Sequence, residues 1–303
     1  MKINISKGLF FSDGCVVRRD VLLLAAGFNA DPDQDYSRVV FSLGGEWRHF
    51  DVEEDAVISV TASGDTGYVV ASNGSVFEVP LNASLTIKAI DEKMREWMIE
   101  SVVDYGELTR VRAISGVPYC CGQSGQVYRL GKTKWVRADH GLRSDEGPDL
   151  EDIDGSGVDD VYVVGIGGAM HHFDGATWRR VDLPTNLNLS NIRRASDGVY
   201  YACGDDGLIL KGCGHDWRIV TDIVPDKNYW GLEVFNGGVY LAHDKGIDRL
   251  MDDQVLPVPL GIPGRLTFHR LHAGNGHLYS FGTDDVLKFD GISWSRITIP
   301  VRS

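Results

Sequence analysis

One stretch of the chain concentrates residue types that metal and redox sites use. YYACGDDGLILKGCGHDW (residues 200–217) contains Cys203, Cys213, the adjacent pair Asp205 and Asp206, and a histidine. If a short strand lies between the cysteines, their sulfur atoms are roughly 15 Å apart. That separation excludes a disulfide and a shared zinc ion. We interpret the two aspartates as the middle of a tight turn, where Asp is a favoured residue.

A second segment, DIDGSGVDD, matches part of a calcium-loop pattern. Oxygen-bearing side chains stand at positions 1, 3, 5 and 9 of that pattern: Asp152, Asp154, Ser156 and Asp160. Val163 occupies the place of the glutamate that an EF-hand needs, so an EF-hand is excluded. Two interpretations stay open: a calcium loop of another kind, or carboxylates that pair with arginines inside the fold.

The motifs do not assemble into a recognisable catalytic site. His171 and His172 are adjacent, and adjacent side chains of a strand point to opposite faces, so they are a poor pair of metal ligands. Motif spacing yields no Ser-His-Asp, Cys-His or paired-carboxylate arrangement. We therefore assign no catalytic, cofactor-binding or metal-binding residues and expect no cofactor.

An internal repeat organises the elements that carry these residues. A tyrosine recurs in one column, mostly with a glycine three residues later and then a turn glycine: Tyr68, Tyr119, Tyr162, Tyr201, Tyr240 and Tyr279. A tryptophan ends most repeats: Trp47, Trp135, Trp178, Trp217 and Trp294. The period of roughly 40 residues is characteristic of propellers and accommodates about seven repeats.

Each repeat contains four short strands separated by Gly-, Asp- and Asn-rich turns. Such units arranged radially form a β-propeller, in which each blade buries both faces against its neighbours. We predict an all-β propeller of seven blades, one domain over residues 1–303, with a helical insertion at 91–101. The expected blades are residues 9–52, 57–90, 107–139, 149–183, 189–223, 229–260 and 267–300.

The innermost strands of these blades carry charges that alternate in sign from the third blade to the seventh. The side chains concerned are Arg110, Arg112, Asp152, Asp154, Asn191, Arg193, Glu233, Arg270 and His272. We expect them to form ion pairs near the axis, which would satisfy buried charges. Propeller enzymes also collect residues from several blades at the axis, so an enzyme stays an alternative.

Composition narrows the classes of partner. The net charge of −13 disfavours nucleic acids and anionic membranes as partners and favours a basic protein. Neither a secretory signal nor an apolar run of roughly 20 residues is apparent. The five cysteines form an odd number and fit a reducing compartment. We expect a cytoplasmic monomer.

The unit VYxxGxxGxxxxxxGxxW resembles the repeats of bacterial BNR-like and photosystem-assembly-type propellers. FDGATW (173–178) and FDGISW (289–294) resemble sialidase Asp-boxes, although Asp and Gly are adjacent and the preceding Ser or Thr is absent. The repeats as a whole also resemble those of propellers encoded beside bacterial polymorphic toxins. That resemblance implies an immunity protein, which binds and occludes a toxin domain.

We expect binding on the face that carries the loops between second and third strands together with the connections between blades, and we call it the loop face. Its segments are acidic with interspersed aromatics, a combination that supplies charge steering and binding hot spots. The candidate contact residues are Tyr36, Trp97, Asp205, Asp206, Tyr229, Trp230, Asp244, Asp284 and Asp285. The alternative is that these acidic loops only keep the protein soluble.

The sequence thus favours a non-enzymatic, protein-binding propeller, in its most specific form an immunity protein for a basic toxin domain such as a nuclease. Two alternatives stay open. One is a propeller lyase or hydrolase that acts on glycans or lactones, and the other is a general scaffold for protein assembly.

Overall fold

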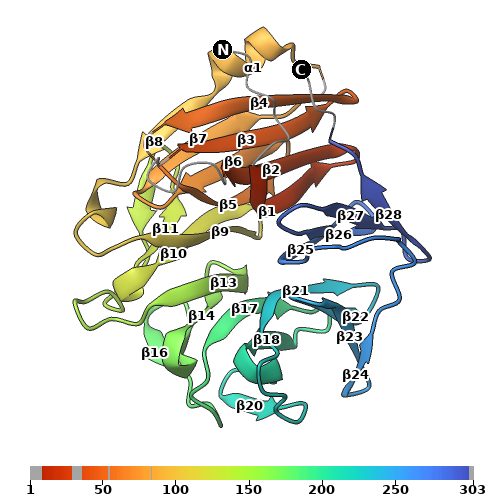
Figure 1. The fold of residues 1–303 in the computed structure, drawn as a ribbon. Helices are drawn as coiled ribbons and strands as arrows, with labels where there is room; N and C mark the ends of the chain where they lie inside the picture. The colour runs from red at the N-terminus through yellow and green to blue at the C-terminus, as the bar shows by residue number, and fades with distance from the viewer. Residues whose placement is uncertain (1–8, 29–35, 54, 83, 300–303) are drawn as a thin grey trace.

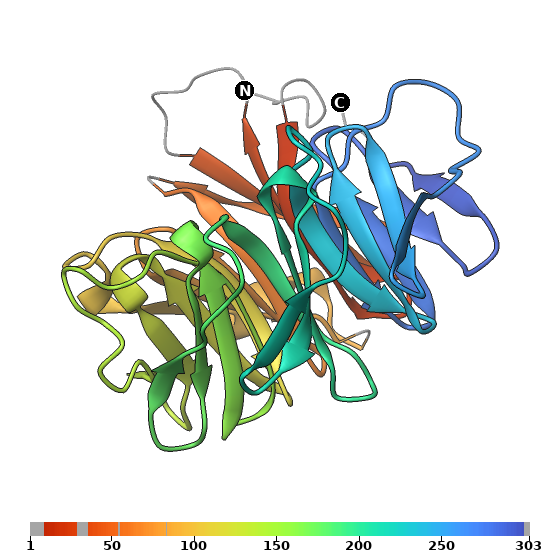
Figure 2. The same cartoon turned by 90° about the horizontal axis from the view of Figure 1, so that it is seen from below.

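Seven sheets of four antiparallel strands make up the fold, and each sheet follows the order of the sequence. The computed structural model describes residues 9–28, 36–53, 55–82 and 84–299. Figure 1 looks along the axis of the ring, with the first strand of each blade nearest the centre, and Figure 2 shows the ring from the side. The predicted seven-bladed β-propeller is confirmed.

The strands of the first four blades have the following bounds. Blade 1 contains β1 (Leu9–Arg18), β2 (Val21–Phe28), β3 (Tyr36–Leu43) and β4 (Glu46–Glu53). Blade 2 contains β5 (Val57–Ser63), β6 (Thr66–Ala71), β7 (Ser75–Pro80) and β8 (Arg95–Met98). Blade 3 contains β9 (Leu108–Ile114), β10 (Val117–Gly122), β11 (Val127–Leu130) and β12 (Trp135–Arg137). Blade 4 contains β13 (Leu150–Gly157), β14 (Asp160–Gly165), β15 (Met170–Phe173) and β16 (Trp178–Arg180).

The remaining three blades complete the ring. Blade 5 contains β17 (Leu189–Arg194), β18 (Tyr200–Gly204), β19 (Ile209–Cys213) and β20 (Asp216–Ile219). Blade 6 contains β21 (Tyr229–Phe235), β22 (Gly238–His243), β23 (Gly246–Met251) and β24 (Gln254–Pro257). Blade 7 contains β25 (Arg270–Gly274), β26 (His277–Phe281), β27 (Val286–Phe289) and β28 (Trp294–Ile297).

The second blade differs from its prediction. We expected it to end at residue 90 before a helix over 91–101, but the helix α1 (Ile87–Lys93) comes first and β8 then supplies the fourth strand. Thr86 caps α1 by accepting a hydrogen bond from the Ala89 amide (3.3 Å). The helix ends at Met94, whose φ and ψ of −59° and 138° return the chain to an extended conformation.

The recurrent aromatic residues pack between neighbouring blades. In five of the hydrophobic clusters the column tyrosine of one blade meets the tryptophan of the next: Tyr68 and Trp135, Tyr119 and Trp178, Tyr162 and Trp217, Tyr240 and Trp294, and Tyr279 and Trp47. The roughly 40-residue spacing is therefore the spacing of inter-blade contacts, each of which buries large apolar surface.

The glycine column has a steric cause. A Cβ atom at Gly204 would lie 1.8 Å from the carbonyl oxygen of Asn188, and one at Gly165 would lie 1.9 Å from that of Asp149. Both oxygens belong to the residue before the innermost strand of the same blade. Only glycine allows the second strand to approach the incoming connection this closely.

The ring closes between the first and last blades. The Phe11 amide donates to the Thr283 carbonyl (2.9 Å), and the Val16 amide donates to His272 Nδ1 (3.3 Å). Phe281 packs with Val16 and other residues of β1–β3 in one hydrophobic cluster. The segment MKINIS lies outside the described residues.

Candidate functional site

Ion pairs join the innermost strands around the axis. The Asp152 side chain is fully buried and contacts guanidinium nitrogens of Arg112 (2.9 Å), Arg193 (2.7 Å) and Arg110 (3.4 Å). Arg193 also contacts Glu233 (3.4 Å). Burial opposes ionisation of Asp152, but the three guanidinium groups outweigh it and hold the pKa of its carboxyl well below the usual range. The predicted ring of ion pairs is thus present over blades 3 to 6.

Asp13 extends this network into blade 1, which sequence reasoning missed. Its carboxylate accepts hydrogen bonds from Ser59 Oγ (2.7 Å) and the Val60 amide (3.1 Å), and it pairs with Arg110 (3.2 Å). Blade 1 fits the repeat least well, so no alignment placed Asp13 at the axis. The available signal was that Asp13 is a lone acidic residue in the first strand of blade 1, whereas the first strand of blade 3 is basic.

Arg270 departs from the predicted alternation. Among the described residues no carboxylate lies within 4 Å of it, and its Nη1 donates to the Trp230 carbonyl instead (2.5 Å). Glu233 is turned toward blade 5, where it contacts Arg193. Burial and the neighbouring Arg110 lower the pKa of Arg270 to about 9.

The side chains of the calcium-loop pattern belong to separate networks. Asp160 accepts hydrogen bonds from His172 Nε2 (2.8 Å), Tyr200 Oη (2.8 Å) and Ser156 Oγ (2.5 Å), whereas Asp152 lies among the axial arginines. Over the described ranges no group of three or more His, Cys, Asp or Glu side chains is placed to hold a metal ion. The structure therefore favours the ion-pair interpretation of Asp152.

Cys203 and Cys213 lie apart. Cys203 is buried at the centre of blade 5, Cys213 is exposed at the end of β19, and both are free thiols. Asp205 and Asp206 form the turn between β18 and β19, with Asp206 in the left-handed conformation (φ 53°). The turn interpretation is confirmed.

The nine predicted contact residues differ in exposure. Exposed on the loop face are Trp230, Asp244 and Asp284. Half-buried are Tyr36, Trp97, Asp205 and Asp206. Trp97 lies on β8 and packs against the hydrophobic cluster between blades 2 and 3 rather than projecting from a loop.

For two of the nine, Tyr229 and Asp285, the prediction is wrong, because their side chains are buried. The Tyr229 hydroxyl donates to Asp248 (2.7 Å) inside blade 6. Asp285 accepts a hydrogen bond from the Thr267 amide (2.9 Å) and pairs with Arg296 (3.0 Å). Neither side chain is exposed on the loop face.

The turn aspartates of blade 5 hold the connections beside them. Asp206 Oδ1 accepts from the Asp226 amide (3.1 Å), and the Asp206 amide donates to Asn228 Oδ1 (3.1 Å). Asp205 Oδ2 accepts from Asn188 Nδ2 (2.9 Å). These side chains thus fix the connections that enter and leave blade 5, a structural task that limits their contact with a partner.

The loop face nevertheless carries a strong excess of negative charge. Its exposed carboxylates are Glu100, Asp104, Glu107, Asp145, Glu146, Asp149, Asp182, Asp222, Asp226, Asp244 and Asp284. Within the described part of its loops, the exposed lysine and arginine side chains are Lys245 and Arg265. The field at this face therefore attracts cationic surfaces. In the described chain no helix is long and apolar enough to span a bilayer.

This chain is similar to known proteins in sequence and in structure. No family model matches it. It is 34% identical over 197 residues to the immune protein Tsi7 of Pseudomonas aeruginosa, and this match covers 63% of the chain and 64% of Tsi7. The match therefore spans slightly less than two thirds of that relative's length.

Solved structures share the fold at low sequence identity. YCF48 bound to the D1 peptide superposes with a TM-score of 0.68 at 14% identity, covering 95% of this chain and 93% of YCF48. The WD40 propeller domain of Doa1 gives 0.67 at 13% identity, covering 97% and 94%. Both resemblances predicted from the repeats, to photosystem-assembly-type propellers and to immunity proteins, are found again in YCF48 and Tsi7: the chain is a seven-bladed propeller similar in sequence to an immune protein.

Proposed function

We propose that this chain is a non-enzymatic immunity protein that binds a basic toxin domain, such as a nuclease, through its loop face and covers the toxin's active site. The observation that carries the proposal is the 34% identity to the immune protein Tsi7 over 197 residues. The proposed protein acts in the cytoplasm as a monomer.

The surface chemistry supports a basic partner. Unpaired surface carboxylates speed the encounter with a cationic protein and disfavour anionic ones. Trp230 provides an aromatic anchor on the same face, since 37% of its surface is exposed and its ring centroid lies 6.3 Å from that of His269. Arg270 donates a hydrogen bond to the Trp230 carbonyl, which fixes the backbone that carries this anchor before binding.

Binding to the product of the neighbouring gene tests this proposal. We expect a stable complex whose affinity falls as salt rises, because exposed charges are screened. Changing Trp230→Ala, Asp244→Lys and Asp284→Lys together should weaken binding at least about 100-fold, equivalent to about 2.7 kcal/mol, and should abolish protection of cells that express the toxin.

A matched variant on the opposite face provides the control. Asp159, Asp197 and Ile292 are exposed in turns of that face. The triple change Asp159→Lys, Asp197→Lys and Ile292→Ala alters charge equally and should leave affinity within about threefold. Equal loss in the two variants, or no complex with wild-type protein, would contradict the proposal.

A further inference from the structure

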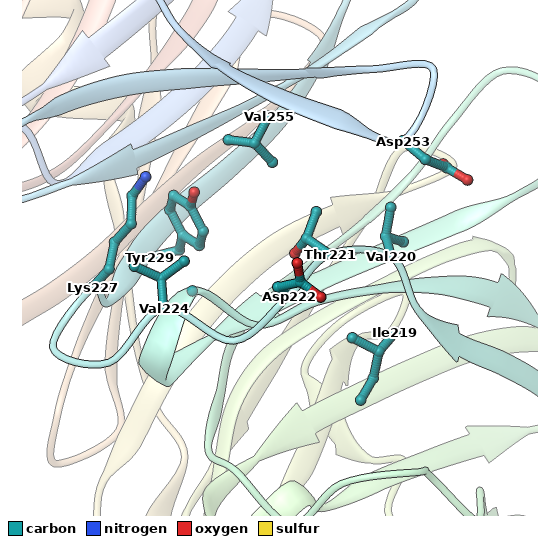
Figure 3. A pocket seen from close by; sticks show the side chains of 10 residues that line it. Ile219, Val220, Thr221, Asp222, Val224, Lys227, Tyr229, Asp253 and Val255 are labelled. Carbon is teal, nitrogen blue, oxygen red and sulfur yellow. The ribbon is translucent and has the colours of Figure 1, made fainter.

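A groove lies between blades 5 and 6, lined by residues of their outermost strands, β20 and β24, and of the connection between the blades. Figure 3 shows the side chains that line it. Its volume is about 650 Å³, within the range of roughly 300–1,000 Å³ that is usual for ligand sites. We call it the interblade groove. It is lined by Gly207, Ile219, Val220, Thr221, Asp222, Val224, Lys227, Tyr229, Asp253 and Val255.

The walls of the interblade groove are apolar. Ile219 ends β20 and Val255 lies on β24, and these are the outermost strands of adjacent sheets. Val224 comes from the connection between the blades and leaves 48% of its surface exposed. Ile223, in the same connection, is also exposed (44%). Clustered exposed aliphatic side chains of this kind mark interaction sites on soluble proteins.

The floor is rigid and carries little net charge. Asp248 is buried and accepts hydrogen bonds from Lys227 Nζ and from Tyr229 Oη (2.7 Å). Burial opposes ionisation of Asp248, but its hydrogen bonds and the lysine charge hold the pKa of the carboxyl well below the usual range. The Lys227 charge is therefore neutralised by Asp248 and does not repel a cation.

The rim is acidic. Asp222 lines the groove, and the exposed Asp226 and Asp252 are next in sequence to the lining residues Lys227 and Asp253; over the described residues none of the three has a cationic group within 4 Å. Asp253 pairs with Arg218 (2.5 Å), which cancels that one carboxylate. A ligand with an apolar group between positive charges is thus complementary to the walls and the rim together.

One buried polar atom beside the interblade groove has no hydrogen-bond partner among the described residues. Thr221 lines the groove, and no donor or acceptor of the described chain reaches its buried Oγ1. An unsatisfied buried hydroxyl costs free energy that a ligand's peptide group would recover. The site therefore has hydrogen-bonding capacity in addition to apolar surface.

We propose that the interblade groove binds a segment of a partner protein in which an aliphatic side chain stands next to lysine or arginine. The aliphatic group occupies the apolar walls, and the cation lies against the unpaired Asp222 carboxylate at the rim. A second copy of this chain is a poorer occupant, because each copy carries a net charge of −13. The inference rests on the proposed function for the identity of the partner and adds the chemistry that the partner segment presents.

A titration with synthetic peptides tests the site without any toxin. The probe is the end-capped peptide GSKLKLKSG, observed through the methyl NMR signals of Val220, Val224 and Val255. We expect these signals to shift with a dissociation constant of about 1 mM or tighter. The matched peptides GSKAKAKSG, without the aliphatic groups, and GSELELESG, with reversed charge, should each bind at least about tenfold more weakly.

Adjacent substitutions on β24 provide matched protein variants. Val255→Arg places a long cation in the interblade groove and should weaken binding of GSKLKLKSG at least about tenfold, whereas Leu256→Arg, on the other side of the strand, should change it less than about twofold. Asp222→Lys, in the exposed connection, tests the rim without touching packed residues and should weaken binding about threefold or more.

Several results would overturn the inference: no methyl shifts with GSKLKLKSG, equal binding of either matched peptide, or unchanged binding to both Val255→Arg and Asp222→Lys. Failure here is distinguishable from failure of the proposed function. If the protein binds the peptide but not the product of the neighbouring gene, the peptide site is supported and the immunity role is contradicted. If the protein binds the gene product but not the peptide, the immunity role is kept and only the proposed peptide site in the interblade groove is contradicted.

Discussion

At the scale of single residues, the axial charges show how one carboxylate stabilises several strands. The Asp152 carboxylate pairs with arginine guanidinium groups of blades 3 and 5. It also accepts a hydrogen bond from the Ile192 amide of β17 (3.0 Å). A buried arginine without its partner is costly, because an unpaired charge is poorly solvated inside a protein. The ionised Asp152 side chain therefore stabilises several strands at the axis at once.

Asp152→Asn is expected to lower the free energy of unfolding at pH 7 by about 3–5 kcal/mol, since Arg112 loses its carboxylate partner and Arg110 and Arg193 each lose one of two. The pKa of the folded carboxyl lies below its ordinary 3.8, so its contribution is complete above pH 4 and is lost as pH falls below that value. The difference between variant and wild type should therefore shrink from pH 5 to pH 2 in urea titrations.

The pH series also contains its own control. Asp197→Asn removes an exposed carboxylate of the opposite face and should leave both the stability and its pH dependence nearly unchanged. A loss for Asp152→Asn of less than about 1 kcal/mol, or one that is constant down to pH 2, would contradict the assigned role.

At the scale of elements, strand and turn signals repeated seven times made the blades predictable, because each copy carries the same packing and turn chemistry. The helix α1 was misplaced because SLTIKAI alternates like a strand, while its Thr86 cap and the buried Ile90 favour a helix. A repeat also predicts where a loop lies without predicting which side chains turn inward. Tyr229 and Asp285 were therefore placed on the correct loops but with the wrong exposure.

The connection after blade 5 should depend on the Asp206 side chain. Asp206→Gly keeps the left-handed conformation available but removes the acceptor of the Asp226 amide hydrogen bond. We expect faster amide hydrogen exchange over residues 222–228 and a stability change within about 1 kcal/mol. Hydrogen-exchange mass spectrometry with wild-type protein measures this directly.

The equivalent change in blade 3 tests whether the effect is local. Ser124 has the same place and the same left-handed conformation (φ 53°) in the turn after β10. Ser124→Gly should leave exchange over 222–228 unchanged. Unaltered exchange in Asp206→Gly would show that backbone contacts alone hold this connection.

At the scale of the whole molecule, the propeller separates structural charge from surface charge. The axial carboxylates face arginines, so they contribute little to the external field, while the loop face presents carboxylates that have few cations near them. Much of the net charge of −13 consequently lies on the loop face. A rigid closed ring is required for this arrangement, since the loops come from all seven blades.

Closure of that ring depends on side-chain packing between blades 1 and 7. Phe281 is 1% exposed and packs with Val16, Leu22 and Leu24. Phe281→Ala should cost about 3–5 kcal/mol and raise hydrogen exchange in β1 and β26 together, because the cavity faces both blades.

Phe173→Ala provides the comparison, because Phe173 is similarly buried between blades 3 and 4 (8% exposed). It should lose comparable stability but raise exchange in blades 3 and 4, with β1 unchanged. If Phe281→Ala left β1 as protected as in wild type, the backbone hydrogen bond from Phe11 to Thr283 would suffice for closure. A joint rise in β1 and β26 instead means that the aromatic contact keeps the loops of the first and last blades in one continuous face.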